Sequence, residues 1–409
     1  MQHHRPAEFI ALVALLTAMV AMSIDTMLPA IGLMAQELGA ANPNDRQLIV
    51  LGFFAGLMFG TLIFGPISDS VGRKPTIYGG IGLFIVGCLI CMFATNFPML
   101  IAGRMLQGFG AASPRVCSMA MVRDGAGGAA MARIMSFVMS VFMLVPILAP
   151  SIGQLVLFLT TWRMIFAGFI LMAVLAGLWL ALRQEETLEP ENRHAFSAAS
   201  LIASAGEVIR NRVSLGNTLA VGFVFAAFTA YLGTSQQIFA EQYGQGPYFA
   251  LWFGGLAVAI AIAMIVNGRL VMRLGMRLLA KYALWGFIAT WAVMSAITIA
   301  SGGHPPLAAV GVLFFLSFFC SGMLFGNFNA MAMEPMGHIA GMAAAVTGAL
   351  SSLIGVAFGA LAGRFYDGTM YPLSFAFLIF GLATLVFAEW AASAAKRAGH
   401  GMGAQKTGA

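Results

Sequence analysis

Charged residues are scarce in this chain. Only 9% of its 409 residues are charged, while 60% are hydrophobic. An ordinary soluble domain carries about 25% charged residues, so this composition cannot cover a surface that faces water. The scarcity excludes a soluble enzyme, a nucleic-acid-binding protein and a disordered chain. The net charge of +6 does not indicate nucleic acid, because the cations lie between long apolar runs, as in membrane proteins.

Cysteine is rare as well. The four cysteines lie within apolar stretches, so no extracytoplasmic disulfide framework is predicted. Cys88 and Cys91 form a C-x-x-C pair, but the sequence offers no second ligand pair, and two small apolar residues on one helix face is the favoured interpretation. No phosphate-binding loop is present. We expect no metal, nucleotide or prosthetic group, and no enzymatic activity.

Long hydrophobic runs fill most of the sequence. A membrane-spanning helix needs ~20 mainly apolar residues, and twelve such runs occur. They lie near 9–31, 47–68, 76–95, 97–122, 133–160, 163–183, 214–240, 247–270, 277–300, 305–332, 338–364 and 371–392. The predicted fold class is an all-α integral membrane protein with twelve transmembrane helices in two pseudo-symmetric six-helix bundles.

A polar stretch over 184–213 separates six runs from six and holds five of the 15 acidic residues. We predict an N-terminal bundle over 1–183, a C-terminal bundle over 214–392 and a cytoplasmic tail over 393–409. The stretch between the bundles is predicted to be a cytoplasmic linker with an amphipathic helix over 195–212.

Lys and Arg set the orientation of a membrane protein. With the N-terminus inside, the inner segments hold 16 of the 21 Lys and Arg residues, the outer loops hold three, and Arg104 and Arg115 lie within spans. This bias predicts both termini in the cytoplasm, in a multi-pass protein of a bacterial inner membrane.

The two halves repeat one loop. Gly65 and Gly72 follow the second run, Gly268 and Gly275 follow the eighth, and each pair is seven residues apart with a cation two residues later. Repeated halves are typical of secondary transporters, whose binding site lies at the midplane between them. The sequence therefore predicts a transporter that is not driven by ATP and that is adequate as a monomer.

Two charges lie inside runs at matching depth. Asp25 and Arg104 are each about six or seven residues from the outer end of a span, which places both ~10 Å below the surface. A charge at the bilayer centre costs at least ~2.5 kcal/mol unless it is paired or wet. Burial favours a neutral carboxyl group and a nearby arginine favours the charged form, so a change in their contact would bind or release a proton. We predict that this pair carries proton coupling; the alternative is a fixed ion pair that joins two helices.

The loop after the second run has the residues of a cytoplasmic gate. Its glycines permit close helix approach and a tight turn, and Asp69 can cap a neighbouring helix N-terminus. Arg73 can bridge to Asp124 at the inner end of the fourth run. The alternative, an anchor that only sets topology, explains the cations but not the acid or the glycines. The predicted gate residues are Gly65, Asp69, Gly72, Arg73, Lys74 and Asp124.

Polar residues on apolar runs are candidates for the substrate cavity, although helix–helix hydrogen bonds explain any one of them equally well. Arg115 follows Pro114, which would kink its helix; it could receive an anionic or carbonyl-bearing substrate, or extend toward the cytoplasm. The cavity candidates are Gln107, Arg115, Tyr231, Gln236, Asn327 and Asn329.

Several motifs together resemble the major facilitator superfamily. The letters GPISDSVGRKP from Gly65 resemble its loop signature, and RMLQGFGAA from Arg104 resembles its motif in the fourth span. Pro146, Pro150 and Gly153 in the fifth span resemble the antiporter motif, which is typical of exporters.

Three further segments resemble one branch of that superfamily, the bicyclomycin/chloramphenicol-resistance (Bcr/CflA) drug:proton antiporters. They are SIDTMLPA from Ser23, VRD from Val122 and ETL from Glu186. The resemblance implies alternating access and proton-driven export, with Asp25 and Arg104 as coupling residues.

The chain departs from the family pattern at three positions. Ser70 stands where the loop motif usually has a cation, and Gln154 where a second glycine is usual in the fifth span. We therefore expect a cytoplasmic gate that is held less strongly and a fifth span that is stiffer at its prolines. Arg115 is an additional charge, which argues against a standard preference for cationic drugs.

The sequence thus predicts a proton-coupled secondary transporter that exports small amphipathic drugs or antibiotics. The alternative is a transporter of a specific metabolite or organic anion with arginines as substrate ligands. The expected partners are a small-molecule substrate, protons and the lipid bilayer, and no nucleic acid.

Overall fold

The structure, a computed structural model, describes residues 6–125, 128–193 and 198–406. These residues form helices joined by short turns, and no β-strand occurs among them. Parts of the predicted linker (194–197) and of the predicted tail (407–409) lie outside the described residues.

Within the described residues, twelve helices have at least 20 residues, as many as the spans that the sequence predicts. They are α1 (Pro6–Asp25), α3 (Leu48–Val71), α4 (Arg73–Met92), α5 (Phe97–Gly125), α6 (Gly128–Leu159), α7 (Arg163–Arg183), α9 (Arg212–Gln236), α10 (Phe249–Leu274), α11 (Met276–Ala300), α12 (Leu307–Met333), α13 (Ala340–Arg364) and α14 (Tyr371–Lys406). The shorter elements are η1 (Leu28–Ala30), α2 (Ile31–Glu37), η2 (Pro43–Gln47), η3 (Pro190–Asn192), α8 (Ala198–Arg210), η4 (Gln237–Gln242), η5 (Gly246–Tyr248) and η6 (Glu334–Ile339).

Ten segments of the described chain are long and apolar enough to cross a membrane. One of them, Leu307–Arg364, contains both α12 and α13. The remaining long helix, α5, does not qualify, because its arginines, glycines and serines make it the least apolar of the twelve. Its polarity marks it as a helix that serves more than anchoring.

Two spans differ most from their predicted limits. The first run, predicted as one span near 9–31, is broken, because α1 ends at Asp25 and the chain turns before η1. The last run was expected to end near 392, but α14 continues to Lys406. Alanine, a strong helix former, is the most frequent residue between 393 and 406.

The chain divides into two compact units. Unit 1 comprises Met1–Ser197 and Leu232–Ala257, and unit 2 comprises Ala198–Tyr231 and Val258–Ala409. Helix α9 therefore begins in unit 2 and ends in unit 1, while α10 begins in unit 1 and ends in unit 2. The bundle limits drawn from the sequence remain a prediction.

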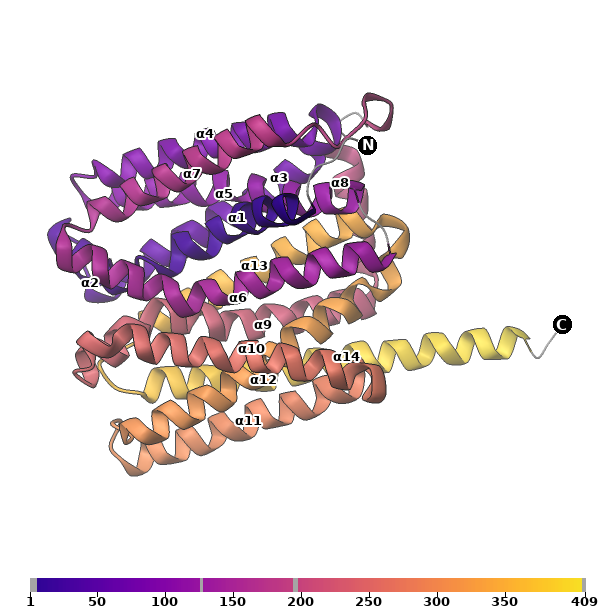
Figure 1. Cartoon of the computed structure of the whole chain (residues 1–409). Helices are drawn as coiled ribbons and strands as arrows, with labels where there is room; N and C mark the ends of the chain where they lie inside the picture. The colour runs from indigo at the N-terminus through magenta and orange to yellow at the C-terminus, as the bar shows by residue number, and fades with distance from the viewer. Residues whose placement is uncertain (1–5, 126–127, 194–197, 407–409) are drawn as a thin grey trace. The chain divides into compact units, whose positions relative to one another are not determined.

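Unit 1 is built around α5, which packs along α3 and α4 (Figure 1). A β-carbon built on Gly56 of α3 would lie 1.9 Å from the Met105 carbonyl oxygen, and one on Gly108 of α5 would lie 2.0 Å from the Phe53 carbonyl oxygen. No side chain fits at either place, so the helices meet backbone to backbone, as small residues allow in membranes. Helix α4 also packs against α7, and α1 against α6.

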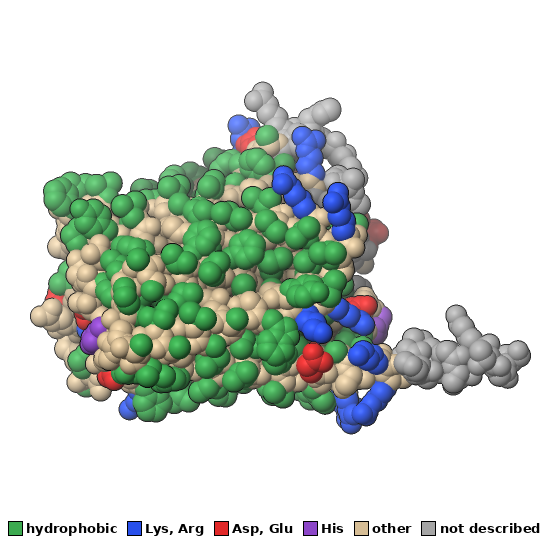
Figure 2. All heavy atoms as spheres, turned by 90° about the horizontal axis from the view of Figure 1, so that it is seen from below, with side chains coloured by type: hydrophobic (Ala, Val, Ile, Leu, Met, Phe, Trp, Pro, Cys, Tyr) green, Lys and Arg blue, Asp and Glu red, His purple; other side chains and the backbone are tan. Residues whose placement is uncertain are grey.

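Unit 2 packs α11 against α12 and α14 (Figure 1). The ring centroids of Trp291 in α11 and Phe377 in α14 lie 4.2 Å apart. The Trp291 indole N–H donates to the Ser317 hydroxyl of α12 at 2.7 Å. The short helix α8 packs through Val208 against η6 and α13. Figure 2 shows hydrophobic side chains over most of the face it displays, as expected of a surface that contacts lipid.

Candidate functional site

Asp25 occupies the break in the first span. It is the last residue of α1, its exposed fraction is 5%, and the chain turns at Thr26 and Met27 before η1 begins. Within the described residues its carboxyl group makes no hydrogen bond or ion pair, and the neighbouring Thr26 hydroxyl is buried without a hydrogen-bond partner. A buried acid at a helix break is the arrangement that transporters use for coupling ions.

The antiporter motif of α6 contacts this break directly. A β-carbon on Gly153 would lie 1.7 Å from the Thr26 carbonyl oxygen, so only glycine fits between α6 and the residue after Asp25. Pro146 and Pro150 lie inside α6, which remains one continuous helix from Gly128 to Leu159. The motif therefore holds α6 against the backbone beside the acid.

Arg104 is enclosed on α5. Its side chain is inaccessible, its Nε donates to the Ile49 carbonyl at 3.0 Å, and its Nη1 donates to the Gln107 amide oxygen. The guanidinium carbon lies 4.6 Å from the centre of the Phe53 ring, a cation–π contact. The remaining nitrogen, Nη2, is buried without a hydrogen-bond partner.

The structure does not bring Asp25 and Arg104 together as an ion pair. The arginine is held by neutral groups of α3 and α5 instead, and Gln107 links it to α4 by donating to the Cys88 sulfur at 3.1 Å. The fixed ion pair that the sequence left open is therefore absent among the described residues. The role of both residues in coupling stays a prediction.

Arg73 is the centre of the loop after α3. Its Nε donates to Asp124 Oδ2 at 2.9 Å, and its Nη1 contacts the Asp69 carboxylate and donates to the Ser68 hydroxyl at 2.8 Å. The Arg73 side chain is only 4% exposed, against 17% for Asp124 and 47% for Asp69. The ion pairs join α3, α4 and α5, and a buried arginine that lost these partners would be costly.

Glu186 caps the helix that Arg73 begins. Its carboxylate accepts hydrogen bonds from the backbone N–H groups of Arg73, Lys74 and Leu188, each at 3.0 Å. The Lys74 ammonium donates to the Gln184 carbonyl at 2.5 Å. We expected that Asp69 can cap a neighbouring helix; in the structure Asp69 binds the Arg73 guanidinium instead, and Glu186 accepts hydrogen bonds from the N–H groups at the start of α4.

The repeated glycines take similar conformations in the two units. Gly72 has a φ of +118° directly before α4, and Gly275 has a φ of +77° directly before α11. Side chains rarely adopt such values, which explains glycine at both turns. Gly65 lies within α3, where a β-carbon would be in ordinary contact with Val116 at 3.9 Å.

Arg115 is the one exposed residue of α5 between Gln107 and Val122. Among the described residues its guanidinium makes no ion pair or hydrogen bond. Its neighbour Pro114 is buried, although α5 continues through it as a helix. The structure thus presents a free cation on an otherwise covered stretch.

The other cavity candidates have different surroundings. Tyr231 is 2% exposed and packs at 4.7 Å against the Phe318 ring. Asn327 is 2% exposed and donates to the Asn267 amide oxygen of α10 at 2.7 Å, which is the helix–helix bond that the sequence allowed as its alternative. Asn329 is exposed and donates to the Phe325 carbonyl of its own helix at 2.9 Å.

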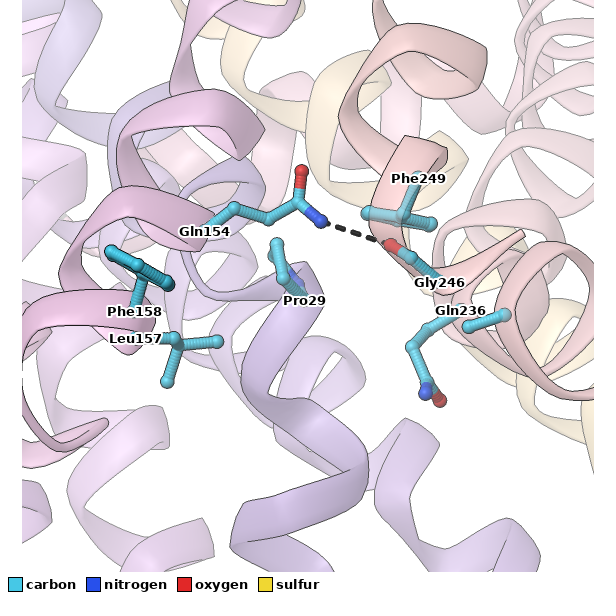
Figure 3. Close-up of a pocket in the computed structure, with 8 residues that line it drawn as sticks. Pro29, Gln154, Leu157, Phe158, Gln236, Gly246 and Phe249 are labelled. Atoms are coloured by element: carbon cyan, nitrogen blue, oxygen red, sulfur yellow. Dashed lines mark hydrogen bonds between the residues drawn. The ribbon is translucent and has the colours of Figure 1, made fainter. Parts of the chain in front are cut away.

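Gln236 lies in the wall of a pocket in unit 1. The pocket has a volume of about 380 Å³ and receives residues from η1, α6, the end of α9, η4, η5 and α10 (Figure 3). Its lining residues are Pro29, Gln154, Leu157, Phe158, Gln236, Ala240, Gly246 and Phe249. Gln154 Nε2 donates to the Gly246 carbonyl at 2.9 Å, as the dashed line in Figure 3 marks.

A polar latch that was not predicted from the sequence lies beside this pocket. Arg46 forms an ion pair with Glu241 and donates from Nη1 to the Gln236 amide oxygen at 3.0 Å. The Gln47 amide donates to Gln237 at 3.2 Å. The π-helical turn η4 carries Gln237 and Glu241, and such turns are frequent at functional sites. The only sequence signal was that Arg46 is one of three cations in predicted outer loops.

Comparison with known proteins gives consistent relatives. The MFS-type transporter YdgK of Bacillus subtilis is 32% identical over 84% of this chain and 85% of its own length. A protein of Haemophilus influenzae named bicyclomycin resistance protein homolog is 29% identical over 90% of this chain and 92% of its own length. The structure of the xylose transporter XylE from E. coli, in a partially occluded inward open conformation, has a TM-score of 0.70. It is 13% identical and covers 94% of this chain and 96% of its own, so it shows the fold alone.

A family model agrees with these relatives. The Major Facilitator Superfamily matches residues 13–360, which include the gate loop, the antiporter motif and both repeated glycines. This family consists of multi-pass membrane transporters of small molecules and not of enzymes. The twelve-helix fold and the resemblance drawn from the motifs are thereby confirmed: the chain belongs to the major facilitator superfamily.

Proposed function

We propose that this chain is a proton-driven exporter of small amphipathic compounds, antibiotics among them. The observation that carries the proposal is the isolation of Asp25, a buried acid without a polar partner among the described residues, at a helix break that Gly153 of the antiporter motif closes. The resistance name of the Haemophilus influenzae relative supports the export of antibiotics.

The coupling step follows from the surroundings of Asp25. An enclosed carboxyl group without a cation beside it holds a proton, and it loses the proton when water or a cationic group reaches it. Arg104, whose Nη2 is buried without a hydrogen-bond partner, could stabilise the carboxylate after such a rearrangement. Proton entry from one side and release to the other would thus drive alternating access.

The gate at the Arg73 loop would control the cytoplasmic side. The ion pairs of Arg73 with Asp69 and Asp124 join three helices, and Glu186 ties the segment after α7 to the same loop. Breaking them would let these helices separate. The proposed orientation, with both termini in the cytoplasm of a bacterium, rests on the distribution of Lys and Arg.

The test is accumulation of three labelled probes in cells: the cation tetraphenylphosphonium, the uncharged chloramphenicol and the anion p-aminohippurate. Cells that express the wild type should accumulate less of at least one probe than cells with an empty vector, and an uncoupler should remove the difference. Equal accumulation of all three probes in both cell types would refute export.

A second candidate function rests on Arg115. A free guanidinium on a covered stretch of α5 would bind a carboxylate or phosphate group, which suits a transporter of one organic anion. In the same assay this function predicts movement of p-aminohippurate alone, abolished by Arg115→Ala. Transport of the other two probes at unchanged rates in Arg115→Ala would exclude it.

A further inference from the structure

The pocket of unit 1 has the size and lining of a small-molecule site. Its volume of about 380 Å³ lies within the range of ligand pockets, roughly 300–1,000 Å³. Five of its lining residues are apolar, namely Pro29, Leu157, Phe158, Ala240 and Phe249. Figure 3 shows that Leu157 and Phe158 of α6 lie on one side and Phe249 of α10 on the other.

Two of the lining residues, Gln154 and Gln236, carry polar side chains. The Gly246 carbonyl can only accept, so the Gln154 atom that contacts it is the NH₂ group, and Gln154 Oε1 remains available as an acceptor. The Arg46 guanidinium can only donate, so the Gln236 atom that contacts it is the oxygen, and Gln236 Nε2 remains available as a donor. Neither remaining atom makes a hydrogen bond with the described residues.

None of the described residues that line the pocket is charged, and the nearby charges of Arg46 and Glu241 are paired with each other. A charged ligand would therefore lose its hydration without gaining an opposite charge. An uncharged ligand with an apolar part, one hydrogen-bond donor and one acceptor satisfies every group in the wall.

We propose that this pocket is a binding site for uncharged amphipathic compounds, separate from the Asp25 and Arg104 region. Gln154 and Gln236 recognise a hydroxyl or amide of the ligand, and Leu157, Phe158 and Phe249 contact its apolar part. The site also gives a reason for Gln154, which stands where the antiporter motif usually has a glycine. The inference rests on the proposed export function only in making the ligand a transported compound.

The backbone next to the proposed coupling residue connects directly to the wall of this site. Gly153 contacts the Thr26 backbone directly after Asp25, and the next residue of α6, Gln154, lines the pocket with Pro29 of η1. A ligand here contacts α6 and η1, the segment that follows the break in the first span. Gln236 connects the same wall to the latch at Arg46.

The test is equilibrium binding to the purified full-length protein in lipid nanodiscs, with labelled chloramphenicol as the uncharged probe and labelled tetraphenylphosphonium as the cation. Gln154→Leu should weaken chloramphenicol binding roughly 3–10-fold, the effect of losing one hydrogen bond, and leave the cation within twofold. Ala240→Phe, which fills the pocket, should weaken chloramphenicol more than tenfold. Gln36→Leu, on an exposed glutamine of α2, and Ala102→Phe, on an exposed alanine of α5, are the matched controls and should match the wild type.

A labelling measurement keeps the proposal testable if a variant fails to fold. In a Cys320→Ser background, where the other cysteines are buried, Leu157→Cys should react with a maleimide, and chloramphenicol but not tetraphenylphosphonium should protect it. Unchanged chloramphenicol binding in both pocket variants, equal loss of both probes, or no chloramphenicol binding by the wild type would each overturn the proposal. Cellular export is measured independently, so a wild type that exports while its pocket variants bind normally refutes the pocket alone.

Discussion

The α-carbon of Gly153 faces the backbone of Thr26 so closely that an added β-carbon would lie 1.7 Å from the Thr26 carbonyl oxygen. The contact brings the antiporter motif of α6 to the residue that follows Asp25. Through this contact the antiporter motif lies beside the buried acid on which the proposed mechanism depends.

Replacing Gly153 by alanine should therefore impair transport at least tenfold. The obstructing atom belongs to the backbone and cannot turn aside, so α6 must move away from the break in the first span, at a cost of about 1–3 kcal/mol. Gly168→Ala in α7 is the control, because no atom lies within 4 Å of its added β-carbon. Proton-driven transport of the probes in proteoliposomes measures both variants, and a Gly153→Ala rate equal to that of Gly168→Ala would remove the packing argument.

Charge reversal tests the cytoplasmic gate at Arg73. Arg73→Asp and Asp124→Arg should each lower transport about tenfold, since each replaces the ion pair by two like charges. The double exchange should recover part of the loss, but not all, because Asp69 and Ser68 also bind Arg73. Initial transport rates of the four proteins form a double-mutant cycle.

Arg123→Asp, on the exposed residue beside Asp124, is the control for charge alone and should stay near the wild-type rate. Strictly additive defects of the two reversals would show that Arg73 and Asp124 act independently, so their ion pair would not hold the gate closed.

Glu186→Gln should destabilise the start of α4. The amide keeps one oxygen but loses the charge that three backbone N–H groups share, a loss of about 1 kcal/mol for a helix cap. Glu185→Gln changes the neighbouring exposed acid and is the matched control. Thermal unfolding of the two purified variants should give a lower midpoint for Glu186→Gln only; equal midpoints would exclude a capping role.

The latch at the pocket predicts a change in accessibility. Arg46→Gln removes the ion pair to Glu241 and the donor to Gln236, so Leu157→Cys should react with a maleimide several-fold faster in that variant. Arg163→Gln, which removes a different ion pair of unit 1, the one with Glu37, should leave the labelling rate unchanged. A common rate in all three proteins would mean that Arg46 does not cover the pocket.

Hydropathy and spacing predicted much of this molecule. Apolar runs are local properties of the sequence, so the twelve helices could be counted without coordinates. The hydrogen bond between Arg104 and Gln107 could also have been predicted, because the two residues are three apart on one helix face. We expected an acid as the partner of Arg104 instead, since an enclosed charge usually has an opposite charge beside it.

Contacts that depend on the path of the backbone could not be predicted in the same way. Glu186 reaches α4 only because the segment after α7 folds back to the Gly72 turn. Arg46 and Glu241 are 195 residues apart, and no periodicity relates them. The pocket could not be predicted because one of its walls, η1, follows the break after Asp25. The sequence gives no sign of that break, since the apolar run continues through it.

The most direct test of proton coupling compares Asp25→Asn with the wild type in proteoliposomes that contain a probe the wild type exports. With a proton gradient, the wild type should concentrate the probe and Asp25→Asn should not, because an amide cannot carry the proton. Without a gradient, both should still exchange labelled for unlabelled probe, which shows that the variant is folded. Glu389→Gln, on an exposed acid of α14, is the control and should behave as the wild type. Full gradient-driven accumulation by Asp25→Asn would show that Asp25 does not carry the coupled proton.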